Sequence, residues 1–110
     1  PALADEGRWY GRCQDGQAAG SGYGVAEDIE GNAIEYVGTA ADGLAQGVGA
    51  MIFRSPGEIG AIYFEGSFRQ GVPDGVVAVE EPGRKPRVRT FQGGVDKGKA
   101  NIQSLQRVQF

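Results

Sequence analysis

Hydrophobic and polar residues alternate with a period of two in the middle of the chain, as they do in a β-strand that buries one of its faces. Successive side chains of a strand point to opposite sides of the sheet, so this pattern predicts a strand at residues 62–68. The segment 34–40 alternates in the same way. One face of the expected strand carries Ile62, Phe64, Gly66 and Phe68, and the other carries Tyr63, Glu65 and Ser67.

The strand at 62–68 belongs to a pattern that occurs four times: an aromatic residue, a Gly two positions later and a second Gly seven positions later. The copies start 27, 28 and 27 residues apart, and such self-similarity indicates a repeat architecture. A third Gly, eleven positions after the aromatic residue, is replaced by Ile102 in the last copy. The aromatic residues are Trp9, Tyr36, Phe64 and Phe91, and the Gly residues follow in the same order at Gly11, Gly38, Gly66 and Gly93, at Gly16, Gly43, Gly71 and Gly98, and at Gly20, Gly47 and Gly75.

The Gly seven positions after the aromatic residue marks a turn, because Gly reaches positive φ at no steric cost. A second strand follows each of the first three turns, so each copy is expected to be one β-hairpin. We also expect consecutive hairpins to pair antiparallel and aromatic rings to lie over Gly residues of the neighbouring strand. The turns are Asp15-Gly16, Asp42-Gly43, Gln70-Gly71 and Lys97-Gly98, the second strands are 20–26, 47–53 and 75–79, and the connections contain Gly31-Asn32, Pro56-Gly57 and Pro82-Gly83.

The tail at 99–110 supports two predictions. It aligns with the second strand of a hairpin, yet Ile102, Leu105 and Val108 recur every three residues. A strand and a short helical cap both stay open, and a cap is what an open-ended repeat array requires.

Composition fits this interpretation, because the chain has 20 Gly among its 110 residues. The formal net charge of -3 argues against a nucleic-acid partner. His is absent, which removes the commonest general base and metal ligand, and the single Cys allows no internal disulfide. The start Ala2-Leu3-Ala4 is a small-x-small triplet of the kind that precedes signal-peptide cleavage. It favours an exported location and leaves a cytoplasmic one open.

The aromatic and Gly spacing resembles the MORN repeat (membrane occupation and recognition nexus). Residues 36–49 give the closest copy, and Phe64-Glu-Gly-Ser-Phe68 gives the best core. The resemblance covers about residues 9–110, and the extra length of each copy lies in the connections, such as 80–87. It implies an elongated, twisted, single-layer antiparallel sheet that serves as a scaffold for protein assembly and is sometimes linked to membranes or phospholipids.

Candidate chemistry is sparse. Cys13 falls in the slot of Ala40 and Phe68, so we expect it to be a small buried residue rather than a nucleophile. Two of the three acidic clusters flank expected turns at the ends of hairpins, where solvated charge is expected, and the Gly-rich segment 20–24 lacks the following helix that a phosphate loop needs. The acidic clusters are Asp5-Glu6, Glu27-Asp28-Glu30 and Glu80-Glu81.

A dense basic patch follows the third hairpin. Four cations within six residues would suit an anionic lipid headgroup or an acidic partner. Pairing with Glu80 and Glu81 across the same turn is the favoured alternative. The four residues are Arg84, Lys85, Arg87 and Arg89.

Several large side chains fall outside the repeated slots and are candidates for binding a protein partner or a second copy of the chain. These are Tyr10, Tyr23, Ile52, Phe53, Tyr63 and Glu65. A single-layer sheet cannot hide both of its faces, so some of these side chains are expected to be exposed.

The sequence therefore predicts an all-β single domain over 1–110: an N-terminal segment at 1–8, then hairpin repeats at about 9–35, 36–63, 64–90 and 91–110. The preferred function is a non-enzymatic scaffold for protein assembly, with no catalytic, cofactor or metal residues. One alternative is a membrane-surface adaptor that binds anionic lipid through residues 84–89. Another is a glycan-binding module or carbohydrate-active enzyme that stacks sugars on Trp9, Tyr10 or Tyr23.

Overall fold

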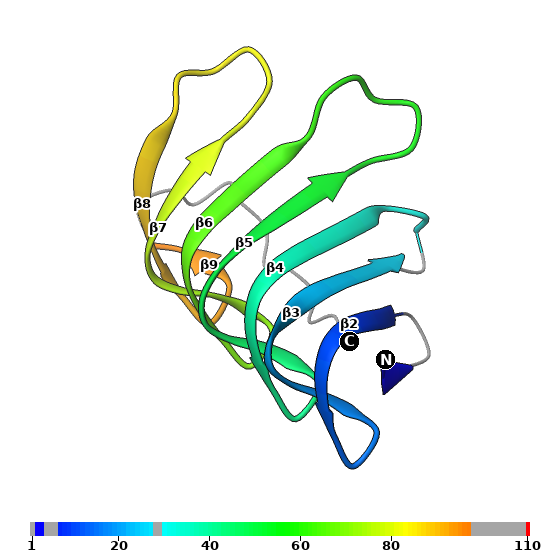
Figure 1. The fold of residues 1–110 in the computed structure, drawn as a ribbon. Coiled ribbons are helices and arrows are strands. Elements are labelled where there is room, and N and C mark those ends of the chain that lie inside the picture. The colour runs from blue at the N-terminus through cyan, green and yellow to red at the C-terminus, as the bar shows by residue number, and fades with distance from the viewer. Residues whose placement is uncertain (1, 4–6, 28–29, 98–109) are drawn as a thin grey trace.

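The structure is a computed structural model that describes residues 2–3, 7–27, 30–97 and 110. Its strands pair in chain order into one open, strongly curved antiparallel sheet (Figure 1). This arrangement confirms the predicted all-β sheet of consecutive hairpins. The strands are β1 (Ala2–Leu3), β2 (Gly7–Gln14), β3 (Gln17–Glu27), β4 (Ala33–Ala41), β5 (Leu44–Arg54), β6 (Ile62–Arg69), β7 (Val72–Glu80), β8 (Arg87–Gln92) and β9 (Val95–Asp96). Among the described residues, no helix has the length and apolar character needed to cross a membrane.

The first three hairpins reverse where the sequence predicts, at Asp15-Gly16, Asp42-Gly43 and Gln70-Gly71. Both central residues have positive φ, for example 53° at Asp42 and 82° at Gly43, as in a type I′ turn. Each later turn also bonds to the hairpin before it. The amide of Gly43 donates to the carbonyl of Ala18 at 3.0 Å, and that of Gly71 donates to Ala45 at 2.9 Å.

The fourth hairpin does not reverse at Lys97-Gly98 as predicted, and Gly98 itself lies outside the described residues. The last hairpin reverses at Gly93-Gly94, where φ is 57° and 88°, and β9 follows directly. The amide of Gly94 donates to the carbonyl of Pro73 at 2.9 Å, which is the same contact that the earlier turns make. The last hairpin therefore keeps the stacking contact but is shorter than its aromatic spacing suggested.

The strand register explains this error. Phe91 pairs with Gly75 as Phe68 pairs with Gly47, so Phe91 occupies the slot of Phe68. Arg87 then stands where the earlier copies carry their first aromatic residue. The spacing from Phe91 to Gly93 imitates the start of a copy, whereas the true start lies four residues earlier.

The Gly eleven positions after the aromatic residue forms a β-bulge. The second strands start directly after their turns, three residues earlier than predicted, so Gly20, Gly47 and Gly75 lie inside them with φ of 84°, 96° and 92°. The register shifts on the partner strand at the same level, for example between Gly38 and Ala40. A bulge bends its strand and increases the local twist, in accord with the bent hairpins of Figure 1.

Aromatic rings lie over Gly residues of the neighbouring strand, as predicted. The ring of Trp9 covers Gly22, and the ring of Tyr36 covers Gly49. A Cβ at Gly49 would lie 2.5 Å from the Tyr36 hydroxyl oxygen, so only Gly fits there. Both rings are fully buried and form the centre of what we call the core face of the sheet.

The polar tips of these two rings are satisfied by one repeated contact. Trp9 Nε1 donates to the carbonyl of Arg12 at 2.9 Å, and the Tyr36 hydroxyl donates to the carbonyl of Thr39 at 2.7 Å. In both cases the acceptor lies three residues after the ring, beside the bulge. A buried aromatic residue with a polar tip can thus be tolerated without loss of hydrogen bonding.

Phe110 packs on the core face between the first two copies. Its ring centroid lies 5.9 Å from that of Trp9 and 5.8 Å from that of Tyr36, over Gly24. Its amide donates to the carbonyl of Gly43 at 2.6 Å. The rest of the tail, for which a strand or a helical cap was predicted, lies outside the described residues.

The prediction that Cys13 is buried is wrong, because its side chain is exposed. The equivalent Ala40 and Phe68 are buried, since each is flanked by the hairpin that precedes it. Among the described residues, β1 pairs only with Arg8 and Trp9 at the other end of β2. No other strand among the described residues flanks the outer edge of β2 at the end that carries Cys13.

Replacing Gly71 tests the stacked turns. Gly71 is buried, has φ of 91° and bonds to the preceding hairpin, so Gly71→Val should cost about 3 kcal/mol of unfolding free energy through strain and a weakened hydrogen bond. Gly16→Val imposes similar strain at φ 77° in an exposed turn and should cost about 1 to 2 kcal/mol. Urea unfolding measures both. Equal losses would show that the inter-hairpin bond contributes nothing.

Alkaline pH tests the burial of Tyr36. Burial raises the pKa of Tyr36 to about 12, from 10.0 for an ordinary Tyr. The folded protein holds this proton more tightly than the unfolded chain, so the stabilisation is complete below pH 10 and is lost as pH rises towards 12. Between pH 9 and 11.5, Tyr36→Phe should lose about 2 kcal/mol less than the parent. Parallel pH curves in urea unfolding would contradict this expectation.

Candidate functional site

The side of the sheet opposite the core face carries one continuous line of mostly apolar side chains, which with its neighbours we call the open face. The strand register places them directly opposite one another across β2 to β8. Directly opposed side chains lie about 5 Å apart at Cβ, so the line is a contiguous surface. Its members are Tyr10, Tyr23, Val37, Ala50, Glu65, Ala78 and Val88.

The open face leaves large apolar side chains in solvent. Val37 is 55% exposed and Val88 is 68% exposed. Val48 and Val76 lie two residues before Ala50 and Ala78 on the same strands, and they are 72% and 64% exposed. Isolated exposed apolar residues are normal, whereas an aligned patch of them is typical of an interaction surface.

One end of the open face is fixed by a hydrogen-bonded corner. The rings of Tyr10 and Tyr23 stack at a centroid distance of 6.2 Å. The Tyr23 hydroxyl donates to Glu35 Oε2 at 2.9 Å, and Arg54 Nη1 donates to Glu35 Oε1 at 2.9 Å. The hydrogen bond to Glu35 raises the pKa of Tyr23 and orients its ring.

Tyr63 and Glu65 line a shallow hollow of about 150 Å³ further along this surface. Glu80, which pairs directly with Tyr63, lines the same hollow, and Pro86 closes one side of it. Within the described part of the chain, neither Glu65 nor Glu80 makes an ion pair. The lining of the hollow therefore combines apolar residues with two carboxylates that make no ion pair to the described residues.

Ile52 and Phe53 do not share a surface, although the sequence grouped them. Ile52 is paired with Glu35 and Tyr63 on the open face. Phe53 points the other way and packs, partly buried, against the core. The structure therefore brings together five of the six predicted partner-binding residues: Tyr10, Tyr23, Ile52, Tyr63 and Glu65.

The cations after the third hairpin are largely paired. Glu81 Oε2 accepts from Arg87 Nη2 at 2.8 Å and from Arg84 Nη1 at 3.3 Å. Arg89 donates to both oxygens of the buried Asp96 at 2.9 and 3.2 Å. These contacts agree with the favoured alternative of pairing across the turn, with Glu81 rather than Glu80 as the acceptor.

Other predicted chemistry finds little geometric support. Trp9 is fully buried, so its role as an exposed sugar platform is wrong, whereas Tyr10 and Tyr23 stay accessible. In the parts of the chain that the structure describes, no three His, Cys, Asp or Glu side chains gather as metal ligands would. Asp5, Glu6 and Asp28 lie outside the described residues.

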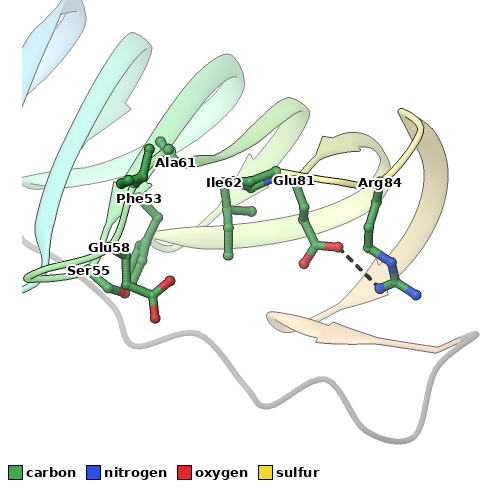
Figure 2. Close-up of a pocket in the computed structure, with 10 residues that line it drawn as sticks. Phe53, Ser55, Glu58, Ala61, Ile62, Glu81 and Arg84 are labelled. Atoms are coloured by element: carbon green, nitrogen blue, oxygen red, sulfur yellow. Dashed lines mark hydrogen bonds and ion pairs between the residues drawn. The ribbon is translucent and has the colours of Figure 1, made fainter.

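Sequence reasoning missed a cavity at the loop end of the sheet. It measures about 280 Å³ and lies between the connection from β5 to β6 and the connection from β7 to β8 (Figure 2). Ile59, on its lip, is 96% exposed. A lone Ile within a Gly-rich and Pro-rich connection was the available signal. The lining residues are Phe53, Ser55, Glu58, Ile59, Gly60, Ala61, Ile62, Glu81, Pro82 and Arg84.

Comparisons of this chain with protein family models, curated proteins and solved structures found no match. The class of fold is therefore defined by the sheet itself: an open, antiparallel array of consecutive hairpins. The resemblance to the MORN repeat rests on the aromatic and Gly spacing.

Vesicle binding tests whether the ion pairs mask the basic turn. Glu81→Gln releases Arg84 and Arg87 and should raise retention on vesicles that contain anionic lipid at low salt. Glu80→Gln changes the net charge equally but breaks no ion pair of the described residues, so it should have a smaller effect. Cosedimentation measures both variants against the parent. Equal retention of the two variants would show that pairing does not limit access to the cations.

Proposed function

We propose that this chain is a non-enzymatic interaction module that binds a protein partner on its open face. The observation that carries the proposal is the register line from Tyr10 to Val88, which is apolar on every strand from β2 to β8 except β6, where Glu65 stands. Such a line offers a partner a largely apolar strip, and removing that strip from water on binding is favourable.

The sheet presents this strip in a fixed conformation. Backbone hydrogen bonds along β2 to β8 hold the side chains in place, and the stacked Tyr10 and Tyr23 are further fixed by Glu35. A preorganised surface loses little conformational entropy on binding. Tyr side chains add large contact areas with few rotatable bonds. The surface therefore suits a protein partner that lies across the strands.

Charge indicates the partner's chemistry. Glu65 and Glu80 border the hollow beside Tyr63, and neither is neutralised by another described residue. A Lys or Arg of the partner can bury its apolar stem in the hollow and keep its charged head at the rim. The proposed partner is thus apolar along the strip and basic where it meets Glu65 and Glu80.

The finer assignment to MORN-like repeats is part of the same proposal. In the first two copies the aromatic ring lies over the Gly thirteen positions later, Gly22 after Trp9 and Gly49 after Tyr36. In the third copy Val77 takes that place and is buried in the same core cluster as Phe64. These contacts give the aromatic and Gly spacing a packing reason.

Photocrosslinking tests the open face. A photoreactive residue at Val37 should give specific adducts in an extract of the source organism, and the same residue at exposed Lys97, off the apolar line, should not. Tyr63→Ala should reduce the Val37 adducts at least fivefold and leave the thermal midpoint nearly unchanged, because Tyr63 is 43% exposed. Equal labelling from Val37 and Lys97 would refute the proposed surface.

A further inference from the structure

The lining of the cavity at the loop end combines apolar and polar residues. Phe53 and Ile62 line it from β5 and β6, and Pro82 lines it from the opposite connection. Figure 2 shows Phe53 and Ile62 projecting to the same side, with Glu81 and Arg84 on the far side of the cavity. Its volume of about 280 Å³ is enough for a branched aliphatic side chain to enter.

The same patch carries a side chain of that kind. Ile59 lies on the lip of the cavity and is 96% exposed. Apolar side chains gain free energy when they leave water. Ile59 cannot fill the cavity of its own chain while it projects into solvent.

The charges of the patch are complementary across its width. Glu58 lines the cavity beside Ile59 and, within the described residues, makes no ion pair. Arg84 lines it from the other connection and is 54% exposed along its side chain. Its contact with Glu81 Oε2 measures 3.3 Å, whereas Arg87 contacts the same oxygen at 2.8 Å. Because Glu81 keeps Arg87 as a partner, Arg84 can exchange the longer contact for a carboxylate of another molecule.

We infer that this patch is a site for a second copy of the chain, in which Ile59 of each copy enters the cavity of the other and Glu58 of each pairs with Arg84 of the other. A two-fold interface uses the same patch on both subunits and must be self-complementary. Here one patch contains both the projecting Ile59 and the cavity that would receive it. The same patch contains both Glu58 and Arg84, which would pair across the interface. The site is separate from the open face and does not rest on the proposed function.

Pairing at the loop end would leave both open faces accessible. Two linked modules can hold a partner with two binding segments, or two partners at once, more tightly than either module alone. A dimer formed in this way would present two apolar strips, one on the open face of each copy.

Sedimentation equilibrium of the full chain over a range of concentrations tests the inference. The parent should show a monomer–dimer equilibrium, and Ile59→Ser should raise its dissociation constant at least tenfold. The substituted residue is almost fully exposed, so the fold should persist, as circular dichroism will show. Val88→Ser removes an equally apolar residue that is 68% exposed on the open face and should leave the dissociation constant unchanged.

A charge exchange makes the test specific to the proposed contacts. Glu58→Arg and Arg84→Glu should each weaken dimerisation at least fivefold, and the double variant should restore it to within about twofold of the parent. A monomeric parent at every concentration, a dimer that is insensitive to Ile59→Ser, or no restoration in the double variant would overturn the inference. A dimer weakened only by Val88→Ser would also overturn it and would place self-association on the open face.

Discussion

A hydrogen bond from the turn of each hairpin to the hairpin before it keeps the repeats in register. Gly43, Gly71 and Gly94 each donate to a carbonyl at the start of the preceding second strand, at 2.9 to 3.0 Å. The turn must adopt positive φ to present this amide, and it must stand at the same level in every copy. The ring-over-Gly contacts and the bulges then fall at fixed distances from the turn. Their positions determine which side chains form the core face.

This constraint explains what the sequence could and could not predict. Hairpins, their order and three turns follow from local rules, because an alternating strand, an Asp-Gly or Gln-Gly turn and a repeat period need no tertiary information. The turn of the last copy was misplaced because Phe91 and Gly93 have the spacing that marks the start of a copy, although they lie four residues after the true start. Only the pairing of Phe91 with Gly75, a contact between neighbouring strands, separates the two alignments.

The error over Cys13 and the separation of Phe53 from Ile52 have different origins. The repeat correctly aligns Cys13 with Ala40 and Phe68. A residue at this position is buried only if another hairpin precedes its own, and among the described residues no hairpin precedes that of Cys13. Ile52 and Phe53 are adjacent in sequence, so strand geometry alone sends them to opposite faces. Strict application of period two would have separated them. The cavity beside Ile59 arises from two connections that the sheet brings together, and no local pattern reports that proximity.

The open face is where strand propensity and function must be told apart. Val is favoured in strands whatever it contacts, so exposed Val48 or Val76 would carry little weight alone. Propensity acts on each strand separately, however, and does not select apolar residues at one register level on strand after strand. The line from Tyr10 through Val37 to Val88 has that alignment on every strand from β2 to β8 except β6, which carries Glu65, while Glu35 and Arg54 fix its first end. Alignment across strands, rather than exposure, is therefore the feature that a binding surface explains and a solvated sheet does not.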